Sequence, residues 1–118
     1  TPGIECHTHE YIKTGSVDSK FGFGIENLEN VFSKIKKSKN VKLVGLHAHI
    51  GSQIFELDPH NDLAEIMVKV ALEAQKFGHI ITEINLGGGL GVKYIQNDDP
   101  PTIDEWVETI SKALIKAC

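Results

Sequence analysis

The apolar residues of this chain recur with a helical period in three segments. Between residues 26 and 39 they fall at i, i+3, i+4 and i+7, which predicts a helix with one apolar face. A second helix is predicted from Asp58, as N-cap, and Pro59, in the first turn, to a stop at Gly78. A third begins at a capping box on Thr102 and is expected to bury one stripe of residues: Ile103, Trp106, Val107, Ile110, Ala113 and Leu114.

Two short apolar runs lie between these helices. Residues 41–50 are apolar almost throughout, the pattern of a strand buried on both faces. Residues 80–86 form a second short strand, which ends where the glycine-rich run 87–91 begins. Residues 3–24 are expected to be an extended start followed by a long loop. The order of elements is a repeat of βα units, which predicts an α/β fold with a parallel sheet and right-handed crossovers.

A doubly wound sheet and a TIM barrel share this local pattern. A (β/α)8 barrel needs eight units and typically about 250 residues, so a chain of 118 residues would form nearly half of one. Half of a barrel leaves strand edges open and apolar faces exposed. Periodicity alone leaves both architectures open.

Composition narrows the function classes. The 12 cationic residues are all lysines and stand against 16 acids, which leaves no basic surplus for nucleic-acid binding. No apolar run approaches the length of a membrane span. Without arginine, any anion site must use backbone N–H groups, hydroxyls or lysines. The two cysteines, Cys6 and Cys118, show no disulfide or metal pattern, which favours a reducing compartment such as the cytoplasm.

Two histidines follow the first strand, at the end where α/β folds bind ligands. Alternation along a strand places His47 and His49 on one face, with His49 nearer the carboxyl end. Such a pair can ligate a metal, or an imidazole ring can stack on a planar cofactor while Gly51 and Ser52 offer donors to an anion. A third interpretation is that the histidines are only buried and hydrogen-bonded.

Three glycines, Gly87, Gly88 and Gly89, follow the second strand. They remove every Cβ and permit positive φ, so the backbone can approach a phosphate and direct N–H groups at it. The dinucleotide fingerprint fails because Val92 occupies its last position, and no Walker motif is present. A phosphate loop of another kind and a plain turn both remain open.

Polar residues of the N-terminal loop allow weaker hypotheses. His7, His9 and Glu10 have the chemistry to chelate a metal, although such residues in a loop are more often only solvated. The stretch 18–22 joins a lysine, an aromatic ring and a glycine, which fits an exposed loop, an interface or the rim of an active site.

Four ordered motifs together resemble a known enzyme family. They are Thr8-His9-Glu10-Tyr11-Ile12-Lys13-Thr14-Gly15, Asp18-Ser19-Lys20-Phe21-Gly22, Gly45-Leu46-His47-Ala48-His49-Ile50-Gly51-Ser52-Gln53 and Asn85-Leu86-Gly87-Gly88-Gly89-Leu90-Gly91. The chain resembles the pyridoxal-phosphate decarboxylases with an alanine-racemase-like barrel, and among them the diaminopimelate decarboxylase family. The resemblance implies a partial (β/α)8 TIM barrel of about three to four βα units.

The resemblance also implies roles for single residues. His49 would stack on the pyridine ring of pyridoxal 5'-phosphate, and Ser52 would bind its phosphate. The backbone of Gly87, Gly88 and Gly89 would bind the same phosphate, with Gly89 the first candidate for a contact. Lys20 would lie near the subunit interface, because these enzymes are homodimers.

Other family motifs have no match here. The lysine that carries the cofactor as a Schiff base belongs upstream, and none of the 12 lysines matches its motif. The later Glu-Pro-Gly-Arg motif and the C-terminal β domain are absent as well. We therefore expect residues 1–118 to be an internal fragment of the cofactor-binding barrel, inactive alone, from a lysine-forming enzyme that removes CO2 from meso-2,6-diaminopimelate.

Three alternatives remain at this stage. A decarboxylase of ornithine or arginine shares the same fold, and a pyridoxal-phosphate homeostasis protein binds the cofactor without turnover. A metal-dependent hydrolase barrel would use His47 and His49 with further ligands at later strand ends, where this chain has glycines. Cytoplasm is the expected location, and a plastid remains open.

Overall fold

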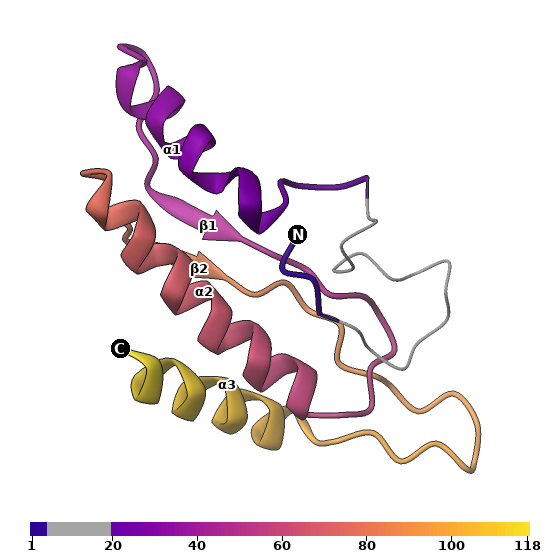
Figure 1. The fold of residues 1–118 in the computed structure, drawn as a ribbon. Helices are drawn as coiled ribbons and strands as arrows, with labels where there is room; N and C mark the ends of the chain where they lie inside the picture. The colour runs from indigo at the N-terminus through magenta and orange to yellow at the C-terminus, as the bar shows by residue number, and fades with distance from the viewer. Residues whose placement is uncertain (5–19) are drawn as a thin grey trace.

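The computed structural model describes residues 1–4 and 20–118. Its elements are a 3-10 turn η2 (Ile25–Asn27), helix α1 (Leu28–Lys37), strand β1 (Gly45–His47), helix α2 (Asp58–Lys76), strand β2 (Glu83–Asn85) and helix α3 (Ile103–Ala117). Figure 1 shows that the loops following β1 and β2 leave the sheet at the same end. The predicted order of helices and strands is confirmed over the described residues.

The two strands are parallel, as predicted. Their register pairs Gly45 with Glu83 and His47 with Asn85, and α2 connects them. Regular strand structure covers only three residues of each predicted run, although the Thr82 and Glu83 N–H groups also donate to the Val44 carbonyl. A run of apolar residues predicts burial, whereas a strand is defined by backbone hydrogen bonds to a neighbouring strand. The strands are therefore shorter than the apolar runs.

The prediction that β1 is buried on both faces is wrong. His47 is exposed, Leu46 is half-buried, and Val41 and Val44 upstream are exposed. Within the described residues β1 pairs with one strand only, and its second edge has no neighbour. Full burial begins only after the strand, at Ala48 and Ile50.

Helices α1 and α2 follow their predicted spans closely. The chain enters α1 through η2, and the helix ends at Lys37, two residues before the predicted limit. Helix α2 has Leu57 as N-cap instead of Asp58, because the Leu57 carbonyl accepts the N–H groups of His60 and Asn61. Gly78 ends the helix region with φ of 80°, a left-handed conformation that favours glycine.

Helix α3 starts at the predicted capping box. The Glu105 N–H donates to the Thr102 hydroxyl, and the Thr102 N–H donates to the Glu105 carboxylate. The predicted buried stripe is wrong at Ile103 and Val107, which are exposed. Helix α3 packs along α2, so only the side turned to α2 is covered, with Ala113 fully buried.

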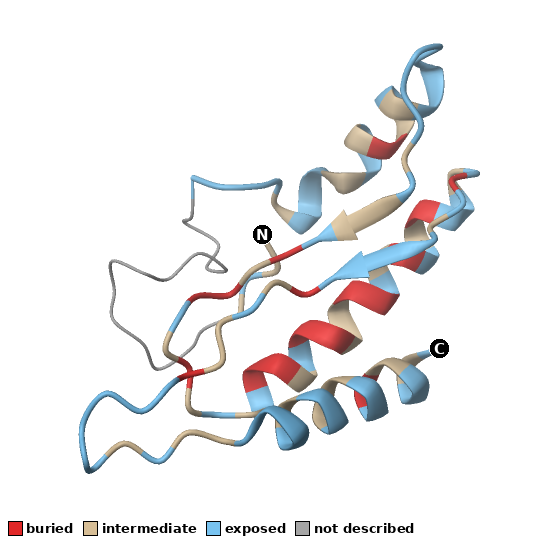
Figure 2. Cartoon of the chain, turned by 180° about the vertical axis from the view of Figure 1, so that it is seen from behind, coloured by how far each residue is buried: buried red, intermediate tan, exposed pale blue. Residues whose placement is uncertain are grey.

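The core lies between the strand ends, α2 and α3. Its buried members include residues from both loops that follow the strands: Ala48, Ile50, Ile54, Leu63, Ala64, Met67, Leu86 and Ala113. Figure 2, seen from behind, shows the buried positions concentrated along α2 and in the segments just beyond the strands. The loops that follow the strands are therefore anchored in the core.

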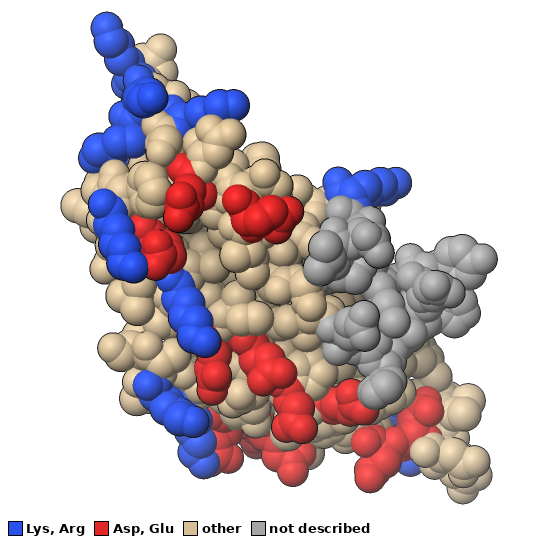
Figure 3. All heavy atoms as spheres, in the orientation of Figure 1, with Lys and Arg blue, Asp and Glu red and all other residues tan. Residues whose placement is uncertain are grey.

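Charge is unevenly distributed over the visible face in Figure 3. Lysines gather at the end where α1 terminates, among them Lys34, Lys36 and Lys37, and acids gather toward the opposite end. Within the described part of the chain, no helix combines the length and apolarity that a bilayer crossing needs.

Candidate functional site

The loops after β1 and β2 are joined to each other by backbone hydrogen bonds. The Ile54 N–H donates to the Gly89 carbonyl at 2.9 Å, and the Gly91 N–H donates to the Ile54 carbonyl at 2.8 Å. These bonds form an isolated parallel bridge between Ile54 and Leu90. The bridge brings the segment of His49 and Ser52 beside the glycine run.

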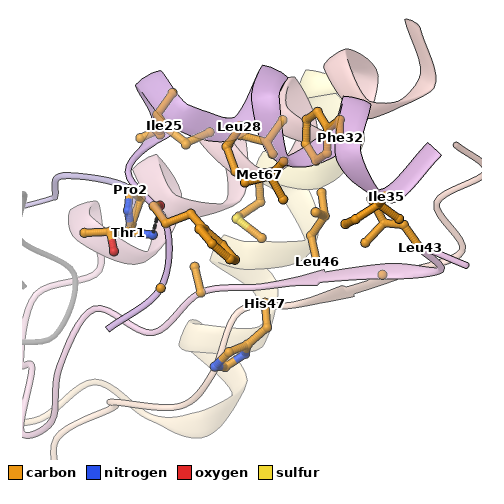
Figure 4. Close-up of a pocket in the computed structure, with 17 residues that line it drawn as sticks. Thr1, Pro2, Ile25, Leu28, Phe32, Ile35, Leu43, Leu46, His47 and Met67 are labelled. Atoms are coloured by element: carbon orange, nitrogen blue, oxygen red, sulfur yellow. Dashed lines mark hydrogen bonds between the residues drawn. The ribbon is translucent and has the colours of Figure 1, made fainter. Parts of the chain in front are cut away.

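His47 and His49 differ in their surroundings. Figure 4 shows the His47 ring pointing away from the apolar side chains between α1 and β1. Its Nδ1 lies 3.1 Å from Asn85 Oδ1. His49 is half-buried and lies over Gly87, where an added Cβ would come within 2.6 Å of His49 Nδ1. Gly87 therefore permits the close approach of the His49 ring to the backbone.

Two hollows adjoin the strand ends. A cavity of about 320 Å³ lies between α1, β1 and α2, and apolar side chains such as Leu28, Phe32 and Leu46 line it (Figure 4). A second hollow of about 390 Å³ contains both His47 and His49 in its wall. We take the second as part of the candidate site, because His49 lines it and does not line the first.

The three glycines are not equivalent. The Gly87 N–H donates to Asn85 Oδ1 at 2.8 Å. A Cβ on Gly89 would lie 2.4 Å from the Gly51 carbonyl oxygen, and φ is 96° there, whereas a Cβ on Gly88 would meet no atom within 4 Å. Among the described residues, no hydrogen bond uses the N–H of Gly88 or Gly89. These two N–H groups are available to an anion.

Ser52 lies exposed in the loop opposite these glycines. A serine hydroxyl can donate to a phosphate oxygen, and so can a backbone N–H. The described residues contain no group of three or more His, Cys, Asp or Glu arranged to hold a metal ion. The donor set at the strand ends suits a phosphate.

His60 lies in the first turn of α2, and its side chain is buried. It is 1% exposed, and its ring meets the Trp106 ring edge-on at 5.7 Å. Neither His60 ring nitrogen nor Trp106 Nε1 has a hydrogen-bond partner in the described part of the chain. Burial lowers the pKa of His60, and the nearby His49 lowers that pKa further.

Two polar residues of this region, Asn85 and Gln53, were not predicted from the sequence as site residues. Asn85 holds both His47 and Gly87, as described above. The Gln53 side chain pairs with the backbone of Val92: its Nε2 donates to the Val92 carbonyl at 3.0 Å, and its Oε1 accepts from the Val92 N–H at 2.9 Å. Gln53 is the last residue of one motif quoted above and Asn85 is the first residue of another, but neither was assigned a role from the sequence.

Several predicted positions lie outside the described residues. They are the candidate metal group His7, His9 and Glu10, together with Cys6 and the motif of residues 8–15. Lys20 is described: it is exposed, and its Nζ lies 5.3 Å from the centre of the Phe21 ring.

Comparison with known proteins gives one consistent family. The family model for the pyridoxal-dependent decarboxylase, pyridoxal binding domain, matches residues 1–118. Diaminopimelate decarboxylase of Synechocystis sp. is 54% identical over 118 residues, which cover 100% of this chain and 25% of that protein. The Bacillus subtilis enzyme of the same name is 41% identical over 117 residues, covering 97% of this chain and 27% of the relative.

A solved structure agrees with the sequence relatives. Diaminopimelate decarboxylase from Helicobacter pylori, crystallised with L-lysine, matches with a TM-score of 0.89 and 33% identity, over 97% of this chain and 29% of that one. The chain thus spans about a quarter of the relatives it matches, and its fold is part of their TIM barrel. The family excludes the metal-dependent hydrolase alternative. The chain belongs to the pyridoxal-dependent decarboxylases, and its residues 1–118 match their pyridoxal-binding domain.

Proposed function

We propose that this chain is an internal part of the barrel of a diaminopimelate decarboxylase, which converts meso-2,6-diaminopimelate to L-lysine and CO2. The observation that carries the proposal is the pair of unused N–H groups on Gly88 and Gly89 beside Ser52 and His49. The identity of 54% to a diaminopimelate decarboxylase supports this substrate over ornithine or arginine.

The residues fit the phosphate of pyridoxal 5'-phosphate. Gly88 has open space where a side chain would stand, and its N–H has no hydrogen-bond partner among the described residues. Gly89 and the Ser52 hydroxyl add two further donors, and the dianion needs no arginine within this chain. Gly87 serves the site differently, because Asn85 already uses its N–H and its missing side chain admits His49.

His49 is the residue we assign to the pyridine ring. Its half-buried imidazole is held over the Gly87 backbone, which restricts the ring to few orientations. A flat side chain in this position stacks on a planar ligand and fixes its tilt, so the reacting bond is aligned for cleavage. When bound, pyridoxal phosphate supplies an electron sink for the pair released as the C–CO2 bond breaks.

The proposal includes a homodimer with Lys20 near its interface. Lys20 and its neighbours Phe21 and Phe23 are exposed, which leaves aromatic surface for a partner subunit. Catalytic residues are expected outside these 118 residues, since no lysine here matches the cofactor-carrying motif. We also place the enzyme in the cytoplasm, because its cysteines form no disulfide pattern.

The test is CO2 release by the longest natural chain that contains this segment. We expect release from meso-diaminopimelate only when pyridoxal phosphate is present, and little from ornithine or arginine. Release from ornithine or arginine instead would move the protein to that branch of the family. Cofactor binding without any release would favour the homeostasis protein.

A further inference from the structure

Gln53 occupies an unusual place between the two loops of the candidate site. It directly follows Ser52, and its half-buried side chain reaches Val92, 39 residues further along the chain. The amide makes two antiparallel bonds with the Val92 backbone, one as donor at 3.0 Å and one as acceptor at 2.9 Å. It thus satisfies a backbone N–H and a backbone carbonyl at once, as a neighbouring strand would.

The backbone of Gln53 is also strained. With φ of 55°, it is the only residue other than glycine with positive φ in the described ranges 1–4 and 20–118. A side chain in the left-handed region costs free energy, and such residues concentrate where the surrounding structure uses the geometry. Here the turn at Gln53 lies between Ser52 and Ile54, the residue that bridges to the glycine run.

The two backbone bonds of Ile54 and the two amide bonds of Gln53 form one continuous set of four. In order along the second loop they involve the Gly89 carbonyl, the Gly91 N–H, and the Val92 N–H and carbonyl. Every bond joins the Ser52 side of the site to the glycine side. We expect these four bonds to fix the separation between the Ser52 hydroxyl and the N–H groups of Gly88 and Gly89.

We propose that Gln53 is a positioning residue for the phosphate site: its amide holds the loop of Ser52 against the loop of Gly88 and Gly89, so the donors are arranged before the phosphate arrives. This inference rests on the proposed cofactor site. Arranging donors in advance lowers the ordering cost of binding, so losing the clamp weakens the phosphate contacts without removing a donor. Gln53 itself touches neither phosphate nor substrate.

The test measures dissociation constants of pyridoxal 5'-phosphate and of pyridoxal, which lacks the phosphate, for the longest natural chain containing this segment. For Gln53→Ala we expect the constant for pyridoxal phosphate to rise about tenfold and that for pyridoxal to change less than about twofold. Gln53→Asn separates the amide from the backbone: asparagine tolerates positive φ, yet its shorter side chain cannot reach Val92. It is expected to bind as weakly as Gln53→Ala.

Gln53→Glu adds a second measurement, the pH dependence of cofactor binding. A carboxylate only accepts, so it would face the Val92 carbonyl oxygen, whereas a neutral carboxylic acid both donates and accepts like the lost amide. The dissociation constant of this variant, divided by that of the unaltered enzyme, should fall as the pH drops from about 8 to about 5.5. The same ratio for Gln53→Ala should stay constant, and Gln75→Ala, on the exposed end of α2, is the matched control.

The outcomes distinguish a failure of the Gln53 clamp from a failure of the cofactor site. Equal binding by Gln53→Ala and the unaltered enzyme, equal losses for both ligands, or a Gln53→Glu ratio that ignores pH would overturn the clamp. Failure of the unaltered enzyme to bind pyridoxal phosphate would overturn the cofactor site itself. If Gln53→Ala fails to fold, Gln53→Asn and the pH series on Gln53→Glu decide.

Discussion

Gly89 meets the strictest steric requirement among the candidate site residues. An alanine there would place its Cβ against the Gly51 carbonyl and would keep a positive φ, so Gly89→Ala should lower the free energy of unfolding by about 2 kcal/mol or more. Gly88→Ala is the matched control, because its Cβ would enter open space; we expect a change below about 1 kcal/mol. Urea unfolding of the cofactor-free enzyme measures both, and similar losses would contradict the assigned geometry.

Substitution of His49 and of His47 should affect cofactor binding to different extents. His49→Ala removes the ring held over Gly87, and we expect about tenfold weaker binding of pyridoxal phosphate together with slower decarboxylation. His47→Ala should do less, because the His47 ring is hydrogen-bonded to Asn85 and is not the ring held over Gly87. Fluorescence titration and steady-state kinetics measure the two quantities. Unchanged constants for His49→Ala would remove this residue from the site.

At the scale of elements, His60 joins α2 to α3 through its contact with Trp106. Burial lowers its pKa, so the unfolded chain takes up a proton at this residue more readily than the folded one. The contribution of neutral His60 to stability is therefore complete above about pH 6.5, the ordinary histidine value, and is lost as the pH falls toward the lowered folded value.

His60→Phe tests this pH dependence. Phenylalanine keeps an aromatic ring against Trp106 and carries no proton, so the variant should lose less stability than the unaltered protein between about pH 7.5 and about pH 5.5. The urea midpoint at each pH is the measurement. If the two proteins lose stability in parallel, another group carries the pH dependence.

The helices were predictable from sequence because their determinants are local. The capping box at Thr102 and the glycine stop at Gly78 depend on residues within one or two turns, and both are present as predicted. The strands were less predictable, since hydrogen bonding and burial of Val41 or Val44 depend on neighbours far along the chain. For the same reason, the pairing of Gln53 with Val92 was missed: it forms only when two loops 39 residues apart meet.

At the scale of the whole molecule, the described surface carries much uncovered apolar area. Ile80, Ile103 and Ile115 are each more than two-thirds exposed, at 69%, 71% and 77%. The radius of gyration is 15.4 Å, against about 13.5 Å for a compact domain of this length. The relatives are about four times longer, and we propose that the rest of a barrel covers these residues.

This incompleteness leads to a prediction for the 118-residue chain alone. It holds donors for the phosphate but no lysine in the family's cofactor-carrying motif, so we expect no detectable CO2 release from meso-diaminopimelate. The same assay on the longer natural chain is the positive control. Turnover by the 118 residues would show that the catalytic groups had been assigned to the wrong part of the enzyme.

The most direct test of the central claim, that the phosphate of pyridoxal phosphate binds between Ser52 and the glycines, uses the Ser52 hydroxyl. In the longest natural chain, Ser52→Ala should raise the dissociation constant for pyridoxal phosphate about tenfold, since it removes a hydrogen bond to a charged group. Ser52→Thr, which keeps the hydroxyl, should bind within about threefold of the unaltered enzyme. Unchanged binding by Ser52→Ala would contradict the claim.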